Sequence, residues 1–111
     1  MEIVNICDIV EDRAFKSREN VREITCYQPA VLTDWHEALE APGLDGVIAS
    51  TPCFLHIPVS VAAMKKGIRP GSEVGAAFDV NDCWKLIDTY EETGVPAMLL
   101  ENRCWNRDAL R

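Results

Sequence analysis

Short apolar runs alternate with amphipathic stretches along this 111-residue chain, and this alternation restricts its fold more than any other feature. Short apolar runs are typical of strands buried in a parallel sheet, whereas apolar residues spaced three or four apart are typical of helices packed against one. The order predicts an α/β fold: a Rossmann-like parallel sheet with helices on both faces. Strands are predicted at residues 2–7, 23–26, 45–50, 69–74 and 95–100, and helices at 11–20, 34–41, 58–66, 79–93 and from 106 onward.

Several helix ends are marked by capping residues. Asp34 is the predicted N-cap of its helix, with Glu37 three residues on, which is the spacing of a capping box. Gly67 and Gly94 are predicted to close the helices that precede them. The helix at 79–93 is the clearest, because its apolar residues recur on one face of a 3.6-residue period: Val80, Cys83, Trp84, Ile87 and Tyr90.

Length and charge exclude several classes of protein. The chain is one domain at most and is shorter than a full dinucleotide-binding domain. A net charge of −7 argues against nucleic acid and anionic membranes as partners. No apolar run reaches membrane-spanning length, and Met1 is followed by an acidic residue, so neither a transmembrane helix nor a signal peptide is predicted. The five cysteines form no C-x-x-C pair, which indicates free, mostly buried thiols in a reducing cytoplasm and no metal site.

Polar residues follow nearly every predicted strand. Open parallel α/β sheets bind their ligands at the carboxyl ends of the strands, so these residues are the candidate site. They are Asp8, then Ser50, Thr51 and Pro52, then Glu73, and finally Asn102 beside Glu101.

Two interpretations are open for the first of these candidates. An acidic residue such as Asp8, at the end of an early Rossmann strand, accepts hydrogen bonds from the adenosine ribose and repels a 2′-phosphate. Asp8 is equally suited to cap the helix that begins near Val10. The segment 50–52 is open in the same way: its small hydroxylated residues would let a nucleotide approach the backbone, and Ser-Thr-Pro is also an ordinary turn.

His56 stands at the start of a helix, where a neutral imidazole could donate or accept one hydrogen bond. A single histidine is more often structural than functional. No G-x-S-x-G, H-E-x-x-H or G-x-G-x-x-G motif occurs, so the sequence identifies no catalytic residue, and a pyrophosphate would lack its glycine-rich loop.

Three segments resemble one known family. Val4 to Asp8 (VNICD), then Ser50-Thr51-Pro52 with His56, and Ala63 to Gly67 with Glu73 are similar to the glucose–fructose oxidoreductase / inositol dehydrogenase / rhizopine catabolism (Gfo/Idh/MocA) family over essentially the whole chain. The closest branch is glycoside hydrolase family 109, on the segments Gly71 to Ala76 (GSEVGA) and Met98 to Asn102 (MLLEN) and on Arg107.

The resemblance implies a cofactor and roles for the candidate residues. Family 109 enzymes hold NAD tightly and cleave glycosides through a transient redox step. Asp8 would bind the ribose and favour NAD over NADP. Glu73 would lie near the nicotinamide and Asn102 would face cofactor or substrate. The remaining candidates, which would line the dinucleotide cleft, are Ser50, Thr51, Pro52 and His56.

The chain also departs from the family pattern at several positions. The dehydrogenases read Glu-Lys-Pro where this chain has Glu73, Val74 and Gly75, so their lysine is absent and the hydrolase-like branch is favoured. Trp105 stands where that branch has a tyrosine, and an indole cannot replace a phenol as acid or base. Pro70 removes a donor from a predicted strand, which would cost a ladder hydrogen bond.

The resemblance begins at the family's second strand. The chain is therefore interpreted as a partial NAD(P)-binding Rossmann domain over residues 1–111, truncated at its N-terminus, without the first strand, the glycine-rich loop or a substrate domain. In a 3-2-1-4-5-6 sheet the first strand is central, so its absence predicts two half-sheets with exposed edges, or a new pairing between them. Its expected partners are a dinucleotide and a sugar-type molecule. A non-catalytic fragment that assembles with itself or another chain through those edges is the alternative.

Overall fold

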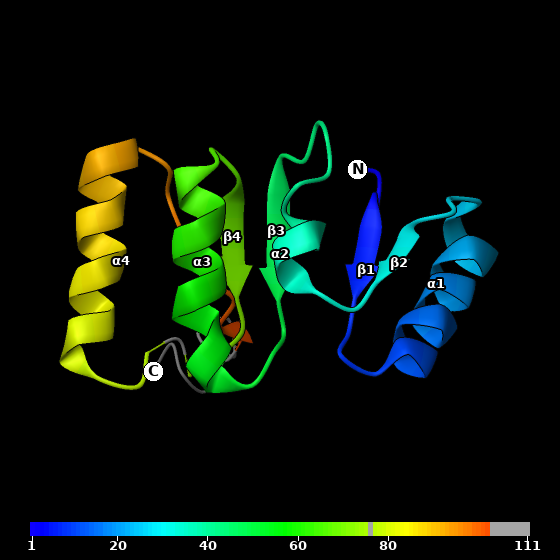
Figure 1. Cartoon of the computed structure of the whole chain (residues 1–111), viewed down its shortest axis with the longest axis horizontal. Coiled ribbons are helices and arrows are strands. Elements are labelled where there is room, and N and C mark those ends of the chain that lie inside the picture. The colour runs from blue at the N-terminus through cyan, green and yellow to red at the C-terminus, as the bar shows by residue number, and fades with distance from the viewer. Residues whose placement is uncertain (76, 103–111) are drawn as a thin grey trace, which may run out of the picture. The chain divides into compact units, whose positions relative to one another are not determined.

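The computed structural model describes residues 1–75 and 77–102 and is a mixed α/β structure with parallel strands (Figure 1). The chain divides into two compact units, Met1–Leu44 and Asp45–Arg111. Unit 1 contains β1 (Asn5–Cys7), α1 (Glu11–Thr25), β2 (Ala30–Leu32) and α2 (Trp35–Ala38). Unit 2 contains β3 (Gly46–Ala49), a 3₁₀ turn η1 (Cys53–Leu55), α3 (His56–Lys65), β4 (Arg69–Ser72), α4 (Val80–Thr93) and β5 (Met98–Leu99).

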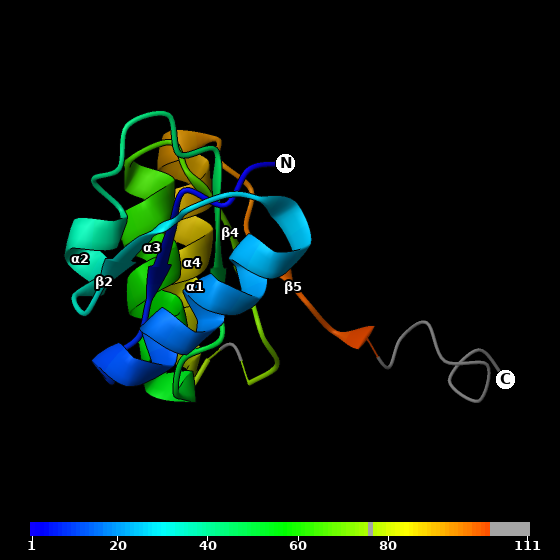
Figure 2. The same ribbon diagram turned by 90° about the vertical axis from the view of Figure 1, so that its right-hand side faces the viewer.

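In unit 1, β1 and β2 form a two-stranded parallel sheet. Both helices pack on these strands, and Figure 2 shows α2 on one side of them and α1 on the other. The side chain of Asn5 in β1 fixes α2 in place, because its Nδ2 donates to the carbonyl oxygen of Ala38 over 2.9 Å. The Asp34 N-cap is confirmed: its side chain accepts from the backbone N–H of His36.

The strand predicted at residues 23–26 is wrong, because α1 continues through this segment. The helix ends at Cys26, whose φ of 62° is left-handed and whose N–H donates to the carbonyl of Arg22. Ile24 is 83% exposed, so its β-branched side chain finds no sheet to pack against. The strand forms instead after the buried Pro29, at β2, where the apolar run pairs with β1.

In unit 2, the strands form a three-stranded parallel sheet in the order β3-β4-β5. Figures 1 and 2 show α3 and α4 on the same face of it. The other face carries Ile48 and Met98, which are 69% and 63% exposed. The apolar run at residues 45–50 is therefore a strand, as predicted, but it is not buried on both faces. The core of the unit consists of Ala49, Ile57, Val59, Ala63, Met64 and Ile68.

Pro70 lies in the middle strand, β4, without costing a ladder hydrogen bond in the described pairs. On the β3 side, the N–H of Arg69 donates to the carbonyl of Asp45, just before β3, over 3.1 Å, and the N–H of Glu73 donates to the carbonyl of Ala49 over 3.0 Å. On the other side, the carbonyl of Ser72 accepts from the N–H of Leu100 over 2.7 Å. Since backbone groups of a strand alternate between its two neighbours, Pro70 faces the β5 side. Pairing with β5 begins only at the next residue of β4, so the expected loss is not observed.

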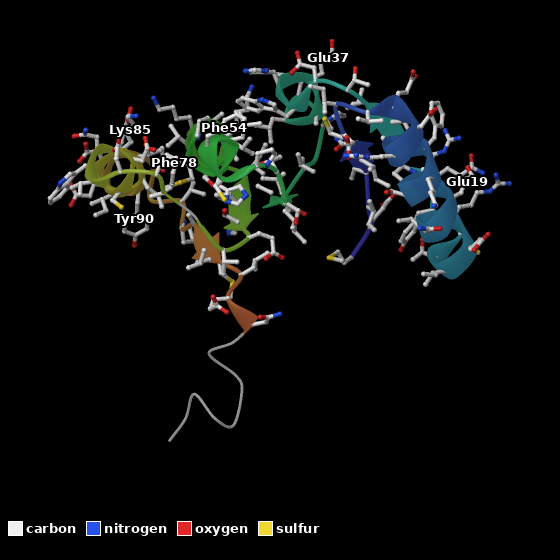
Figure 3. The ribbon with its side chains drawn as sticks, turned by 90° about the horizontal axis from the view of Figure 1, so that it is seen from below. Glu19, Glu37, Phe54, Phe78, Lys85 and Tyr90 are labelled. Carbon is white, nitrogen blue, oxygen red and sulfur yellow. The ribbon has the colours of Figure 1, made fainter. Side chains whose placement is uncertain are left out.

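The predicted helix near residue 80 is confirmed as α4, with an Asp79 N-cap and Gly94 in the left-handed region. Its apolar face, however, is largely exposed: Trp84, Ile87 and Tyr90 expose 58%, 45% and 52% of their surface. Figure 3 shows the side chain of Tyr90 on this helix. The buried residue of α4 is Thr89, and the helix packs beside α3. An apolar hollow of about 310 Å³ lies between α4 and the segment that leads into β5, where Pro96 and Ala97 line it.

The strands form two sheets, as predicted. In the described part of the chain, β1 pairs only with β2 and β3 only with β4, so β1 and β3 are edge strands of their sheets. None of the described helices is long and apolar enough to cross a lipid bilayer.

Candidate functional site

The candidate residues of unit 2 lie at the carboxyl edge of its sheet. Ser72 of β4 pairs with Ala49 of β3 on one side and with Leu99 of β5 on the other, so the three parallel strands end together. Ser50 and Glu73 are the next residues of their strands, and Asn102 follows β5 by a short segment. The prediction that polar residues gather at one edge is therefore confirmed within this unit.

The turn after β3 presents one hydroxyl outward and the other inward. Ser50 and Pro52 are exposed, whereas the Oγ1 atom of Thr51 is buried and has no hydrogen-bond partner among the described residues. The turn passes directly into η1, where the N–H of Leu55 donates to the carbonyl of Pro52 over 2.9 Å. Ser50 is thus the hydroxyl of this turn that a ligand could reach.

His56 lies at this turn, as predicted, but its imidazole is buried. The residue is 1% exposed, and its Nε2 is 2.7 Å from the carbonyl oxygen of Thr51. Its Nδ1 is buried without a partner among the described residues. The side chain of His56 therefore contacts the turn from inside.

The loop after β4 approaches the same turn through Gly75. This glycine has a φ of +82°, and a Cβ atom there would lie 2.9 Å from Sγ of Cys53. The loop that carries Glu73 therefore passes close to η1 at Gly75, where there is no room for a side chain. The sequence did not reveal this role of Gly75, because its contact residue is distant along the chain and no local pattern marks the pair.

Asp8 lies at the carboxyl end of β1 in unit 1. Its N–H donates to the carbonyl of Leu32, and its Oδ1 accepts from the N–H of Val10 over 2.8 Å. Val10 is the N-cap of α1. One carboxylate oxygen of Asp8 thus stabilises the turn that precedes α1, but Asp8 is not the N-cap, because that position belongs to Val10 and no side chain caps this helix. The Oδ2 atom of Asp8 has no hydrogen bond among the described residues.

The cysteines are free where the structure describes them, but they are not mostly buried. Cys26, Cys53 and Cys83 are exposed, because they lie at a helix end, on a turn and on the outer face of α4. Cys7 is half-buried, and burial raises the pKa of its thiol, as does the nearby negative charge of Asp34.

Some sequence predictions fall outside the described residues. These are Ala76, Cys104, Trp105, Arg107 and the helix predicted from residue 106. Within residues 1–75 and 77–102, no three His, Cys, Asp or Glu side chains are grouped so that they could hold a metal ion.

A parallel α/β structure with polar residues after the carboxyl ends of its strands is typical of Rossmann-like domains. Solved structures agree. A dehydrogenase from Chromobacterium violaceum superimposes with a TM-score of 0.82 at 26% identity, over 98% of this chain and 30% of that one. The WlbA dehydrogenase from Bordetella pertussis, solved with NADH and UDP-GlcNAcA, gives a TM-score of 0.78 at 19% identity, over 98% and 32%. The predicted fold class is confirmed.

Proteins with similar sequences indicate a family within this class. A glycosyl hydrolase family 109 protein from Stenotrophomonas maltophilia (strain K279a) is 36% identical over 116 residues, which is 99% of this chain and 26% of that protein. An alpha-N-acetylgalactosaminidase from Tannerella forsythia is 36% identical over 114 residues, covering 98% and 24%. No protein-family model matches. The homologues of this chain are thus family 109 proteins and its structural neighbours are oxidoreductases of the Gfo/Idh/MocA type, as the resemblance implied. The chain spans about a quarter of the length of these curated relatives.

Proposed function

We propose that residues 1–111 form part of the NAD-binding domain of an enzyme that acts on sugars or glycosides by hydride transfer, and that this enzyme is a glycosidase of the family 109 type. The observation that supports the proposal most strongly is the 36% identity to family 109 proteins along nearly the whole chain. The carboxyl edge of unit 2 supports it from the structure, because nucleotide ligands bind at that edge in this fold.

The described residues offer polar groups that could bind part of NAD. The carboxylate of Asp8 has a free Oδ2, which suits a ribose hydroxyl, and Ser50 offers an exposed hydroxyl at the carboxyl edge. Glu73 and Asn102 are on the same edge, on the side proposed for nicotinamide and substrate. The pyrophosphate has no glycine-rich loop in this chain, so we expect the isolated chain to bind NAD weakly or not detectably by calorimetry.

The chain's own contribution is to bind and orient. Bound NAD would supply a hydride acceptor and donor. Asp8 would select the cofactor without a 2′-phosphate, since the two negative charges repel. The turn 50–52 and Glu73 would shape the cleft floor. We assign no catalytic residue, because no acid–base pair stands out among the described side chains.

Nuclear magnetic resonance titration of the ¹⁵N-labelled chain tests the proposal, since it detects millimolar binding. Millimolar NAD should shift the backbone signals of Asp8, Ser50, Glu73 and Asn102, and NADP should shift them less. Asp8→Asn should reduce this preference, whereas Asp79→Asn, a cap on α4, serves as the matched control. NAD-dependent shifts confined to other residues, or none at all, would contradict the proposal.

A sugar oxidoreductase of the same superfamily is the second candidate. The WlbA dehydrogenase, a structural neighbour, binds a nucleotide sugar together with NADH. The absence of a lysine after Glu73 favours the glycosidase instead. A full-length protein that carries this sequence should release p-nitrophenol from p-nitrophenyl α-N-acetylgalactosaminide with no net reduction of NAD. Net NADH formation from a sugar would identify the oxidoreductase.

Self-association through the sheet edges is a proposal of a different class. The unpaired edge strand β3 is favoured for it, because unpaired strands are templates for pairing with another chain, and Ile48 beside that edge is 69% exposed. Light scattering after gel filtration should show a concentration-dependent dimer that Ile48→Lys abolishes. Phe78→Lys, a similarly exposed residue outside any strand, is the control. A monomer at all concentrations would exclude this role.

We also propose that the protein works in the cytoplasm. Four described cysteines are free, and exposed thiols persist in a reducing compartment. Localisation of a tagged full-length protein in cell fractions would check this, and recovery outside the cytoplasm would contradict it.

A further inference from the structure

The imidazole of His56 is one of the largest fully buried side chains of the described structure, and the binding role proposed above does not use it directly. Burying a polar ring costs free energy unless its nitrogen atoms find partners. Among the described residues, only Nε2 has one, the carbonyl oxygen of Thr51 at 2.7 Å. This short bond to a backbone carbonyl two residues after β3 ties the ring to the turn.

The bond fixes the chemistry of the ring. A carbonyl oxygen only accepts hydrogen bonds, so Nε2 must carry the proton and Nδ1 is left as an acceptor. The backbone N–H of His56 donates at the same time to the carbonyl of Cys53. With the bond from Leu55 to Pro52, the segment from Thr51 to the first turn of α3 is closed by three hydrogen bonds.

We propose that His56 is a positioning residue, which fixes the conformation of the Ser50–Thr51–Pro52 turn by donating from Nε2 in a single tautomer. The inference deepens the proposed function and rests on it in one respect, namely that this turn lines the cofactor cleft. His56 acts through the Thr51 carbonyl, and a turn held in this way keeps Ser50 and Pro52 exposed at the carboxyl edge.

Long-range ¹H–¹⁵N spectra of the imidazole rings in the full chain test the tautomer. His56 should give the Nε2–H pattern at neutral pH, with a proton that exchanges slowly with solvent because the ring is buried. His36, an exposed histidine also near a helix start, is the internal reference. An Nδ1–H pattern at His56, or rapid averaging between tautomers, would overturn the proposal.

Two variants test the effect on the turn. His56→Gln places an amide nitrogen where Nε2 lies, so it should keep the slow amide exchange of Leu55 within about threefold. His56→Leu fills the same space without a hydrogen-bond donor, so amide exchange at Leu55 should be at least tenfold faster. A tenfold change corresponds to a loss of about 1.4 kcal/mol in the free energy of opening. Equal protection in both variants would refute the proposal. If the leucine variant does not fold, rescue by glutamine together with the tautomer spectrum decides.

NAD titration of the same samples separates this inference from the proposed function. The tautomer and the exchange rates are measured without NAD. If both are as expected and NAD still leaves Ser50 unshifted, the cofactor proposal fails and the positioning role of His56 stands. If NAD shifts Ser50 equally in the native and leucine chains, the positioning role fails instead.

Discussion

Single side chains at the turn after β3 show how burial changes the meaning of a residue type. The family resemblance implied that Thr51 and His56 would line the dinucleotide cleft. The structure turns both inward, Thr51 Oγ1 without a partner and His56 onto the Thr51 carbonyl. Ser50 alone keeps an exposed hydroxyl there. Sequence pattern identified this turn, but not the direction in which each side chain points.

Thr51→Val should stabilise the protein. A buried hydroxyl without a partner costs free energy, and valine has nearly the same shape without that group, so the free energy of unfolding should rise by about 1 kcal/mol. Urea denaturation measures this change. Thr51→Ser, which keeps the hydroxyl, should show no such gain. A loss of stability in the valine variant would mean that the hydroxyl does have a partner.

The thiol of Cys7 should react more slowly than an unburied thiol at the same pH. Burial, and then the charges of Asp34, Asp8 and Glu37, raise its pKa, so less thiolate is present at a given pH and the rate should rise only at higher pH. Mass spectrometry after pulse alkylation across alkaline pH would measure the profile, with the urea-unfolded chain as reference. Asp34→Asn should move the profile toward lower pH. Identical folded and unfolded profiles would contradict this expectation.

At the scale of elements, helix ends were predicted better than strands. Asp34, Gly67 and Gly94 all occupy the predicted cap positions, since capping depends on a few neighbouring residues. The strand at 23–26 failed because a segment becomes a strand only where a partner accepts it, and β1 pairs with β2 instead. The loop after β4 could not be predicted from local sequence either, because Gly75 in this loop lies close to Cys53 in η1, which is distant along the chain.

Gly75→Ala should destabilise unit 2 more than Gly67→Ala. Both glycines are left-handed, so alanine costs about 1–2 kcal/mol at either position, but only Gly75 also has Cys53 Sγ within 2.9 Å of the new Cβ. Cys53→Ala should remove the excess and leave the two costs equal, as thermal denaturation of the single and double variants would show. Equal costs with Cys53 present would mean that the contact between loop and turn is absent.

At the scale of the whole molecule, the described strands form two half-sheets with separate cores. Unit 1 buries Ala14, Ala38 and Leu39 together with Pro29, whereas the described part of unit 2 buries more apolar residues, chiefly along α3. Local stability follows the density of buried apolar side chains.

Hydrogen exchange should therefore be faster in α1 than in α3. Mass spectrometry of peptides from residues 11–25 and 56–65 would measure the protection of each helix in the intact chain. Peptides from α4 provide a second comparison within unit 2. Equal or greater protection of α1 would show that unit 1 is stabilised by more than the core found here.

The sequence by itself determined the α/β class, the helix ends at Asp34, Gly67 and Gly94, the turn after β3, and the family to which the relatives belong. These properties follow from periodicity and from interactions between residues a few positions apart. Only the tertiary structure decided that β2 lies at Ala30–Leu32, that the apolar face of α4 is exposed, and that His56 is buried against Thr51. Strand pairing and burial depend on contacts between segments distant along the chain, which local patterns do not encode.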